Sequence, residues 1–474
     1  MTYKKNAFRR TKIIATLGPA TNSPEMLEEL ILAGLDVARI NMTHSDHEQA
    51  TSLIATVREI AARLNRVVAI IMDLQGPAIR TGDLKVDFDL KPGELIVLSV
   101  RGETSEEHRS VDVNYDQLVD DIKVDDIVIV DNGEIRLKVL EKRRNQLHCE
   151  VLNEGTLGSR RHINLPGVRV NLPALTEKDI VDVELGVNLE VDYIAMSFVR
   201  EADDVKRLKS ILDYKKSPIR VIAKLEDQEA IRNLNSIIEV SDAIMVARGD
   251  LGIEIPYEEL PIVQRRIVKA CVIKGRPVIV ATHMLESMID SPHPTRAEIT
   301  DVANAVFEQA DAIMLSGETS IGKFPRECIT VMDRIAHRIE SSGGAGYAKE
   351  ADLADKGQQV TKAAVVMASE TNAEALIVFT KNGGMGRNAA RLRPLETPIF
   401  AFTDDERTLG RLALLWGVRP FLMPIVEDAS TNVEGAIKIL REANLLKSGD
   451  NIVAVTELTT RGKIVDSIQM EVVD

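Results

Sequence analysis

The sequence predicts an α/β protein: a (β/α)8 TIM barrel, with a small β-barrel lid domain inserted after strand three and a doubly wound α/β domain at the C-terminal end. Three observations lead to this prediction. Eight short apolar runs alternate with helical segments over the first 320 residues, a stretch of different pattern interrupts them once, and a second α/β alternation follows a glycine-rich segment. The 474 residues suffice for two to four domains of roughly 150 residues each.

The barrel prediction depends on the apolar runs. Short, continuously apolar runs are typical of strands buried on both faces, as in a parallel sheet, and helical segments between them are typical of a (β/α) barrel. Two helices have clear start signals, which are Ser23 before Pro24 and a capping box of Thr295 with Glu298. The predicted strands are residues 12–17, 37–41, 67–73, 193–198, 220–224, 243–247, 277–281 and 312–315. The predicted helices include residues 24–33, 48–64, 202–212 and 260–274.

Between the third and fourth strands, short strands alternate with turn signals such as KPG at 91–93 and DNG at 131–133. This pattern predicts an all-β domain. Because it follows the end of a barrel strand, where active-site loops gather, it is either a lid over the site or a decorative insertion. The predicted boundaries are 1–79 and 174–340 for the barrel, 80–173 for the inserted domain and 341–474 for the C-terminal domain.

The C-terminal domain begins with a segment, SSGGAG at 341–346, that is typical of a flexible linker. After it, helices and strands alternate again, which predicts a doubly wound domain with a role in regulation or assembly. The predicted helices are residues 360–370, 386–393, 406–415 and 432–442, and the predicted strands are residues 375–379, 399–402, 418–422 and 451–455.

Composition excludes several classes of function. Lys and Arg number 59 against 73 Asp and Glu, a net charge of −14, which argues against nucleic-acid or membrane partners. Aromatic residues make up only 3 %, so we expect no stacking platform for single strands. The three cysteines are far apart and no apolar stretch reaches the roughly 18 residues of a membrane span, so we expect a cytoplasmic protein without disulfides. No GxxxxGK[ST], HExxH or GxSxG motif occurs.

The candidate site residues follow the C-terminal ends of the predicted barrel strands. Glu226 and Asp250 follow adjacent strands and suit Mg²⁺, whereas the alternative is that each pairs with a basic neighbour. Lys224 ends an apolar strand and suits an anionic substrate in the barrel mouth, whereas the alternative is a snorkelling surface lysine. The strand ends also carry Arg39, Asn41, Asp73, Arg248, Gly249, Thr282, His283 and residues 316–319. Residues 248–252 (RGDLG) are expected to form a loop whose two glycines let backbone N–H groups approach an anion, for which the alternative is an ordinary turn.

The chain resembles the pyruvate kinase family over essentially its whole length. The motifs that carry the resemblance are TKIIATLGPA, ARINMTHS, MDLQGPAIRTG, GSRRHINLPG, LPALTEKD, DYIAMSFVR, VIAKLEDQEAI, IMVARGDLGIE, ATHMLESM, PTRAEITDVANAV and DAIMLSGETSIGKFP. The resemblance implies transfer of a phosphoryl group from phosphoenolpyruvate to ADP, giving pyruvate and ATP, the last step of glycolysis. It also implies Mg²⁺ as the cofactor, with Mn²⁺ as a substitute, and a homotetramer.

Carried over motif by motif, the resemblance implies roles for individual residues. Lys224 is similar to the lysine that stabilises the phosphoryl group and the enolate, and Arg39 to an arginine that contacts the phosphate. Glu226 and Asp250 look like the metal ligands, and Thr282 lies near the face where the enolate gains its proton. The substrate residues are Arg39, Ala247, Arg248, Gly249, Asp250 and Thr282. The residues near the nucleotide phosphates are Asn41, His44, Arg80, Arg160 and Arg161.

The chain departs from the family pattern in three places. K⁺-dependent members carry Thr, Lys and Glu where this chain has Leu74, Gln75 and Ala78, so we expect activity without K⁺; a remnant of the cation site remains at Asn41, Thr43 and Asp73. Asp227 replaces an asparagine, and it either tightens metal binding or faces solvent. Residues 455–458 lack the glycine-rich loop of members regulated by fructose bisphosphate, so we expect a sugar monophosphate or AMP as effector. Its candidate site is Thr380, Lys381, Asn382, Gly383 and Gly384, for which the alternative is a plain turn.

Two other functions fit parts of the pattern. A metal-dependent barrel lyase acting on pyruvate-like oxo acids would share the carboxylate pair and an enolate intermediate, but it would need neither ADP nor the arginines of the lid. A non-catalytic regulator would bind nucleotide through the C-terminal domain. The presence of Lys224, Glu226 and Asp250 argues against a non-catalytic protein.

Overall fold

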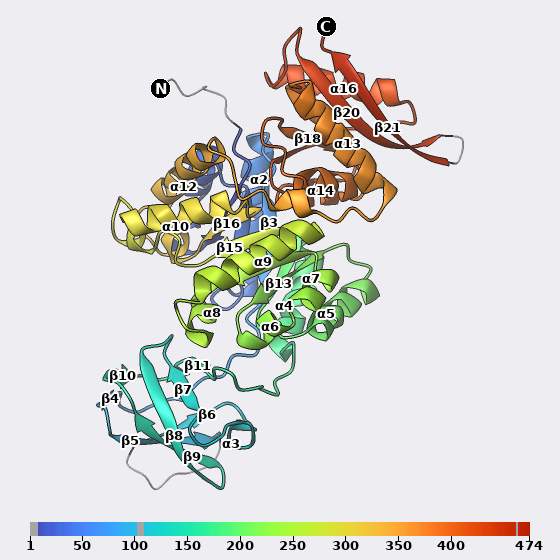
Figure 1. Cartoon of the computed structure of the whole chain (residues 1–474). Helices are drawn as coiled ribbons and strands as arrows, with labels where there is room; N and C mark the ends of the chain where they lie inside the picture. Colours follow the sequence, from blue (N-terminus) through green and yellow to red (C-terminus); the bar gives the residue numbers. More distant parts are fainter. Residues whose placement is uncertain (1–7, 102–108, 461–462) are drawn as a thin grey trace.

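The computed structural model describes residues 8–101, 109–460 and 463–474. It shows a closed barrel of parallel strands, an inserted β domain and a C-terminal α/β domain. In Figure 1 the barrel lies in the middle, the inserted domain at the bottom and the C-terminal domain at the top. The first residues that the sequence assigns to the barrel, 1–7, lie outside the described residues.

The barrel strands close in the order β1-β16-β15-β14-β13-β12-β3-β2. The apolar runs predict each strand to within two residues at either end. Successive side chains alternate between the barrel interior, as at Ile14 and Ile71, and the layer under the helices, as at Ile13 and Ile70. The strands are β1 (Lys12–Leu17), β2 (Val37–Asn41), β3 (Ala69–Asp73), β12 (Tyr193–Met196), β13 (Arg220–Leu225), β14 (Ala243–Ala247), β15 (Val278–Ala281) and β16 (Ala312–Leu315).

Helices surround the barrel and begin at the predicted signals. The Ser23 hydroxyl accepts a hydrogen bond from the Met26 N–H at 3.2 Å, and the Thr295 hydroxyl accepts one from the Glu298 N–H at 3.3 Å. Among the described helices, none is both long and apolar enough to cross a bilayer. The helices are η1 (Pro19–Thr21), α1 (Pro24–Ala33), α2 (His47–Arg63), α4 (Glu177–Asn188), α5 (Ala202–Tyr214), α6 (Gln228–Arg232), α7 (Leu234–Val240), α8 (Arg248–Glu254), α9 (Leu260–Lys274), η2 (Glu286–Ile289), α10 (Arg296–Phe307), α11 (Gly317–Ser320) and α12 (Pro325–Glu340).

The inserted domain has a separate aliphatic core, which includes Ile96, Leu137 and Val139. Its strands form one sheet in the order β11-β7-β8-β9-β5-β6 and a second pair, β10-β4. The elements are β4 (Phe88–Leu90), β5 (Leu95–Val100), β6 (Ser110–Val113), α3 (Leu118–Asp121), β7 (Ile127–Val130), β8 (Ile135–Arg143), β9 (Gln146–Val151), β10 (Gly155–Leu157) and β11 (Ile163–Asn164).

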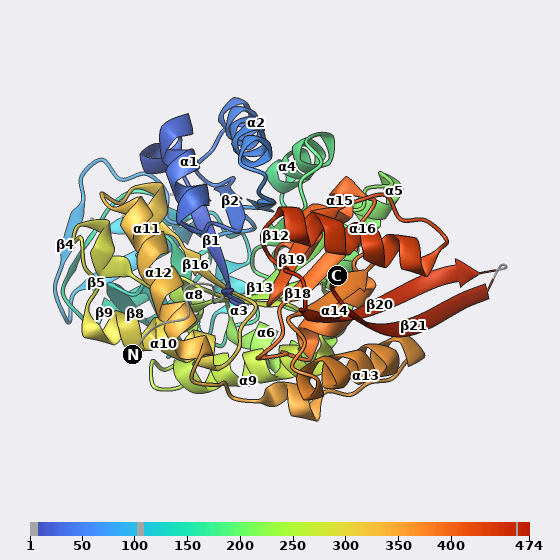
Figure 2. The same ribbon diagram turned by 90° about the horizontal axis from the view of Figure 1, so that it is seen from above.

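The C-terminal domain is a sheet in the order β19-β18-β17-β20-β21, with helices on both faces (Figure 2). Its last two strands form a long antiparallel pair, whereas the sequence pattern predicts only residues 451–455 as a strand there. The elements are η3 (Tyr347–Glu350), α13 (Lys356–Glu370), β17 (Ala375–Phe379), α14 (Gly384–Arg391), β18 (Ile399–Thr403), α15 (Glu406–Leu412), β19 (Val418–Leu422), α16 (Ala429–Glu442), β20 (Asn451–Thr460) and β21 (Lys463–Val472).

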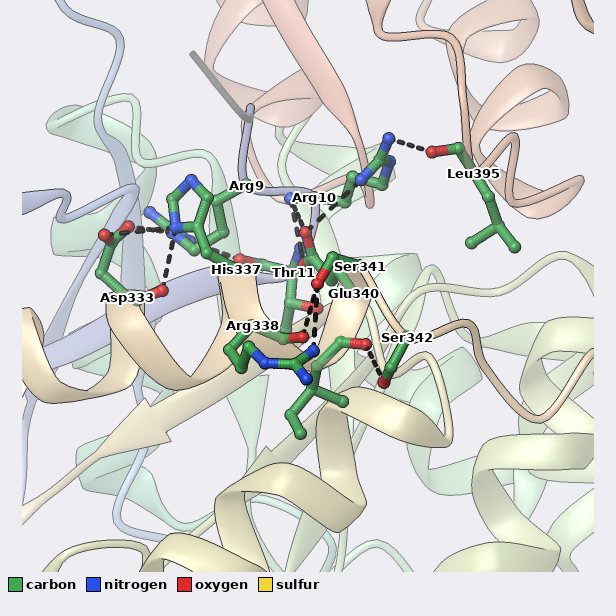
Figure 3. A network of polar contacts seen from close by, with 11 residues as sticks. Arg9, Arg10, Thr11, Asp333, His337, Arg338, Glu340, Ser341, Ser342 and Leu395 are labelled. Atoms are coloured by element: carbon green, nitrogen blue, oxygen red, sulfur yellow. Dashed lines mark hydrogen bonds and ion pairs between the residues drawn. The ribbon is translucent and has the colours of Figure 1, made fainter. Parts of the chain in front are cut away.

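A polar network joins the segment before β1 to α12 and to the C-terminal domain (Figure 3). The Arg9 side chain donates to Asp333 at 2.8 Å, and the Glu340 carboxylate accepts from the backbone N–H groups of Arg10 and Thr11 at 2.9 and 2.7 Å. Arg10 also donates to the Leu395 carbonyl. These contacts lie at the amino end of the barrel, opposite the inserted domain.

Candidate active site

A polar cavity of about 360 Å³ lies between the barrel mouth and the inserted domain. Its floor comes from residues at, or just after, the C-terminal ends of β2, β3, β12, β13 and β14, and its roof comes from the inserted domain. The lining consists of Arg39, Asn41, Thr43, Asp73, Leu74, Gln75, Ala78, Arg80, Asp131, Asn132, Ser159, Arg160, Arg161, His162, Ser197, Phe198, Lys224, Glu226 and Asp250. Six of the residues predicted from strand ends, namely Arg39, Asn41, Asp73, Lys224, Glu226 and Asp250, are therefore brought together here. The others, Arg248, Gly249, Thr282, His283 and residues 316–319, do not line this cavity.

Lys224 lies at the centre of the charged floor. Its Nζ is 2.9 Å from Oε1 of Glu226 and 3.4 Å from Oδ1 of Asp73, and it donates a hydrogen bond to the Ser197 hydroxyl at 2.7 Å. Burial alone would lower the pKa of Lys224, but the two carboxylates outweigh it and hold this pKa above its usual value. The ammonium is thus a buried, permanent positive charge at neutral pH, and Lys224 is not a snorkelling surface lysine.

Arg39 supplies a second buried positive charge. Its Nε and Nη2 contact Oδ2 of Asp73 at 2.7 and 2.6 Å, and its Nη1 donates to the Thr16 hydroxyl at 2.7 Å. Burial alone would raise the pKa of Asp73, but Lys224 and Arg39 together lower it below its usual value. The guanidinium has five N–H groups, so these contacts leave two for a ligand.

The Glu226 and Asp250 carboxylates fit a divalent cation. Glu226 is buried, and its second oxygen accepts a hydrogen bond from the Phe198 N–H at 2.6 Å. Burial raises its pKa, and Asp250 adds to that effect while Lys224 opposes it. No described residue donates a hydrogen bond to the Asp250 side chain, and no three acidic, His or Cys residues of the described chain could hold a metal alone. Mg²⁺ matches this set because it takes one or two carboxylates and completes its shell with water and phosphate oxygens.

Residues 248–252 begin a short helix, α8, instead of the glycine-rich loop that the sequence indicates. The Gly249 N–H donates to the Thr282 hydroxyl at 2.7 Å, which joins the ends of β14 and β15 beside Asp250. The buried Arg248 guanidinium donates to the Thr282 carbonyl at 2.6 Å and pairs with Asp301 at 2.7 Å. Arg248, Ala247, Gly249 and Thr282 therefore lie next to the cavity without lining it, and Thr282 has a φ of 68°, which is rare for a β-branched residue.

The inserted domain brings arginines to the roof of the cavity. Arg80 donates to the Arg160 carbonyl at 3.2 Å, Arg160 pairs with Asp83 at 2.7 Å, and Arg161 pairs with Asp131 at 3.3 Å. Arg160 and Arg161 are exposed, and exposed ion pairs contribute little stability. Both side chains can therefore exchange their carboxylate partners for the phosphates of a ligand.

Several predicted residues lie elsewhere. His44 is exposed and does not line the cavity. Asp227 is half-buried and caps helix α6 by accepting from the Ala230 N–H at 2.8 Å, and burial raises its pKa to about 6. The loop at residues 380–384 lies at the opposite end of the barrel, where the Asn382 side chain already accepts from the Gly384 N–H at 3.0 Å.

Three further residues, Ser197, Phe198 and His162, line the cavity but are not among the residues predicted from strand ends. Ser197 follows β12, so the same rule of strand ends would have identified it. Its hydroxyl donates to the Leu74 carbonyl at 2.8 Å. This hydrogen bond orients the Ser197 oxygen so that it accepts a hydrogen bond from the Lys224 ammonium. His162 comes from the inserted domain, where burial and the nearby Arg80 lower its pKa to about 4, and no strand-end rule applies to it.

The chain matches known proteins along most of its length. The family models described as pyruvate kinase, barrel domain, and pyruvate kinase, alpha/beta domain, match residues 8–329 and 358–466. Pyruvate kinase isozyme G, chloroplastic, of Nicotiana tabacum is 43 % identical over 455 residues, which are 95 % of this chain and 80 % of the relative. A pyruvate kinase of Staphylococcus aureus is 38 % identical over 464 residues, 96 % and 78 % of the two chains. The crystal structure of a pyruvate kinase from Cryptosporidium parvum has a TM-score of 0.92 and 34 % identity, and the match covers 97 % of this chain and 96 % of that chain.

Proposed function

The chain belongs to the pyruvate kinase family of enzymes, and from this premise we propose that it transfers the phosphoryl group of phosphoenolpyruvate to ADP, forming pyruvate and ATP. The observation that carries the proposal is the grouping of the Lys224 ammonium, the Arg39 guanidinium and the Glu226 carboxylate in one cavity. Phosphoryl transfer needs alignment and charge neutralisation more than covalent help from the protein, and these groups supply both.

Within this reaction, Lys224 neutralises the phosphoryl group and then the enolate that remains when the group leaves. The two unused N–H groups of Arg39 hold the phosphate from the side of β2. To hold the substrate carboxylate beside Thr282, the Gly249 N–H exchanges its hydrogen bond with the Thr282 hydroxyl for one with the carboxylate. The enolate gains its proton on that face through water. The arginines of the roof, Arg80, Arg160 and Arg161, bind the nucleotide phosphates together with Asn41 and His44.

Glu226 and Asp250 would hold Mg²⁺, or Mn²⁺ in its place, and the ion would neutralise phosphate charge when bound. Two features support this assignment, namely that both carboxylates line the cavity and that Asp250 has no protein donor among the described residues. Isothermal titration with Mn²⁺ tests it, because Asp250→Asn should weaken binding at least tenfold without substrate, while Asp227→Asn should not.

The direct test of the reaction is ATP formation from phosphoenolpyruvate and ADP, measured with purified protein and Mg²⁺. Wild-type protein should form one ATP for each pyruvate. A lyase acting on oxo acids would convert its substrate without ADP, and a nucleotide-binding regulator would form no product. Either result would contradict the proposed function.

We also propose that turnover does not require K⁺. The Leu74 side chain is buried and apolar, Ala78 has no carboxylate, and Asn41 already accepts from the Thr43 N–H at 3.1 Å. Asp73 is compensated by two protein cations, Arg39 and Lys224, so its carboxylate needs no metal ion for neutralisation.

The inserted domain is proposed to act as a lid that closes over substrate and excludes water. Arg200, which lies between β12 and α5, anchors the end of the inserted domain to the barrel, because its guanidinium donates to the carbonyls of Val170 and Leu172 at 2.7 and 2.6 Å. Fluorescence transfer between labels on the inserted domain and on α2 should change when phosphoenolpyruvate and ADP bind. One unchanged distance would contradict closure.

By family resemblance we further propose a homotetramer in the cytoplasm, with a sugar monophosphate or AMP acting at residues 380–384. Light scattering on the purified chain tests the assembly, and a fluorescent fusion tests the location. Activation by either ligand that survives Lys381→Ala would remove the support for this effector site.

A further inference from the structure

A pocket of about 110 Å³ lies between the inserted domain and the barrel, next to the candidate active site. The two cavities share Glu226, Phe198 and His162, which form the wall between them. The inserted domain lines the pocket with β11 and the segment after it, and the barrel lines it with α6 and the end of α8, the helices that face the inserted domain in Figure 1. We refer to this cavity as the interdomain pocket.

Two polar side chains of the interdomain pocket are almost completely buried. Asn164, at the end of β11, is 5 % exposed, and Glu254, at the end of α8, is 8 % exposed. The Asn164 side-chain N–H donates to Oε1 of Glu254 at 3.1 Å, so this hydrogen bond joins the inserted domain to the barrel. The Oδ1 atom of Asn164 is also buried, but no described residue donates to it. Because a buried acceptor without a donor costs stability, the pocket lacks a donor at this position.

The Glu254 carboxylate has no positive partner among the described residues. Burial raises its pKa to about 7; the hydrogen bond from Asn164 opposes this effect, and the neighbouring carboxylates of Asp227 and Asp250 add to it. A buried carboxylate without a cation beside it is costly. The buried part of the pocket therefore favours a ligand that is positively charged and donates hydrogen bonds.

Three arginines also line the interdomain pocket, but each already has an acceptor. The Arg200 guanidinium donates to two backbone carbonyls at 2.7 and 2.6 Å. At the exposed rim, Arg169 pairs with Glu229 at 3.5 Å and Arg232 donates to the Gln228 side chain at 3.3 Å. An anion in the buried part of the pocket would be repelled by the Glu254 carboxylate, and the arginines would have to leave their present partners to hold it.

The remaining walls of the interdomain pocket are apolar. Ile79 and Leu165 are buried, and Val168, Val170 and Leu172 are partly buried. A cavity of about 150 Å³ accommodates benzene, so a pocket of this size holds roughly four or five non-hydrogen atoms. The pocket therefore suits a ligand with one short aliphatic chain.

We propose that the interdomain pocket binds a small aliphatic amine through its ammonium group. An ammonium has three N–H donors, of which one satisfies Oδ1 of Asn164 and a second contacts the Glu254 carboxylate. The aliphatic part of the amine packs against the apolar walls and leaves water. Neither Asn164 nor Glu254 has a role in the proposed phosphoryl transfer, so this binding does not depend on that reaction.

Calorimetric titration of the full chain with isobutylammonium chloride, without nucleotide, substrate or divalent cation, tests the site. Glu254→Gln keeps the shape of the side chain and removes its charge, whereas Asn164→Leu removes the unpaired acceptor. Each substitution should weaken binding at least tenfold, since a hydrogen bond to a charged group is worth about that factor. Circular dichroism should confirm that both variants fold, and affinity equal to that of wild type in both would overturn the proposal.

Asp250→Asn is the matched control for these variants. Asp250 lines the candidate active site but not the interdomain pocket, so this variant should bind the amine within about threefold of wild type. Loss of binding in Asp250→Asn alone would assign the amine to the candidate metal site and would overturn the proposal.

Two ligands of similar shape test the charge that the pocket recognises. Isobutanol is neutral and isobutyrate is negative, so the first should bind at least tenfold more weakly than the amine and the second should not bind. Equal affinity for the alcohol would show that the charge of Glu254 has no role. Tighter binding of isobutyrate would show that the arginines of the rim determine the ligand. Either result would overturn the proposal.

Thermal unfolding gives a second readout that uses the wild type. Isobutylammonium should raise the melting temperature above that measured in tetramethylammonium at equal ionic strength, because tetramethylammonium has a positive charge but no N–H donor. Val168→Phe, which fills part of the pocket and leaves both polar groups in place, should remove this difference. Equal melting temperatures of the wild type in the two salts would overturn the proposal, and so would an undiminished difference in Val168→Phe.

Discussion

The two ends of the barrel use buried charge differently. At the mouth, Lys224 and Arg39 share the Asp73 carboxylate across an open cavity, and Asp250 has no donor among the described residues. At the amino end, Arg393 and Asp311 form a closed pair in which each side chain is 3 % exposed, and Asp311 also accepts from the Trp416 N–H at 3.1 Å. The first set faces a cavity, whereas the second is enclosed between two domains.

This difference separates catalytic from structural charge. A buried ion pair with every partner in place stabilises the docking of two domains and has no capacity left for a ligand. A cluster that faces a cavity retains free N–H groups and carboxylate oxygens. Substitutions at the mouth should therefore change activity more than stability, and substitutions at the amino end should do the opposite.

The largest effect is expected from Lys224→Met. Removal of the charge should lower kcat roughly 10²–10³-fold or more, the range found for loss of one preorganised electrostatic contact. Circular dichroism should confirm that the fold persists. Activity within tenfold of wild type would contradict the role of Lys224. It would also contradict the proposed difference between the mouth and the amino end of the barrel.

Asp311→Ala should instead destabilise the protein by about 3–5 kcal/mol, because Arg393 is then left buried without its partner. Urea unfolding followed by fluorescence of Trp416 measures this change. The activity of the fraction that stays folded should match that of wild type. A stable variant with a large fall in kcat would show that the amino end takes part in catalysis.

The buried Lys12 at the amino end of the barrel should make the stability of the protein depend on pH. Its Nζ is buried and donates to the Val418 carbonyl at 2.6 Å, and burial lowers its pKa from the ordinary lysine value of 10.5 to about 8. Between these two values the unfolded chain binds a proton that the folded chain does not, so stability should rise with pH across this window. The difference corresponds to about 3 kcal/mol.

The measurement is urea unfolding at several pH values between 7 and 11, for wild type and Lys12→Met. Subtraction of the two curves removes the contribution of other titrating groups. The wild-type curve should be the steeper one from about pH 8 upward. Parallel curves would indicate that the ammonium of Lys12 has an ordinary pKa.

The smallest effect concerns K⁺. Replacement of K⁺ by tetramethylammonium at constant ionic strength should change turnover less than twofold, because Arg39 and Lys224 already neutralise Asp73. A steep rise of turnover with K⁺ would contradict the K⁺ proposal. Ala78→Glu is the matched variant, because it returns a carboxylate to the third-strand motif and should increase the response to K⁺.

The success of sequence-based prediction differed between these regions. Periodicity predicted all eight barrel strands to within two residues, because each strand is buried on both faces and its apolar run has little freedom of register. It missed β21, whose residues Met470 and Val472 are exposed, so no continuous apolar run marks it. Residues 248–252 are predicted as a loop because their two glycines disfavour a helix when only local propensity is considered, whereas the structure forms helix α8 there.

The sequence by itself determined which chemical groups stand at the strand ends, since strand direction and alternation are local properties that place Arg39, Lys224 and Glu226 at one mouth. Tertiary structure alone decided the partners: Asp73 lies between two cations, His162 is brought in by the inserted domain, and Arg393 of the C-terminal domain pairs with Asp311 of the barrel. The reason is that the approach of side chains distant in sequence depends on strand register and on how separate domains dock, and no local pattern of residues encodes either.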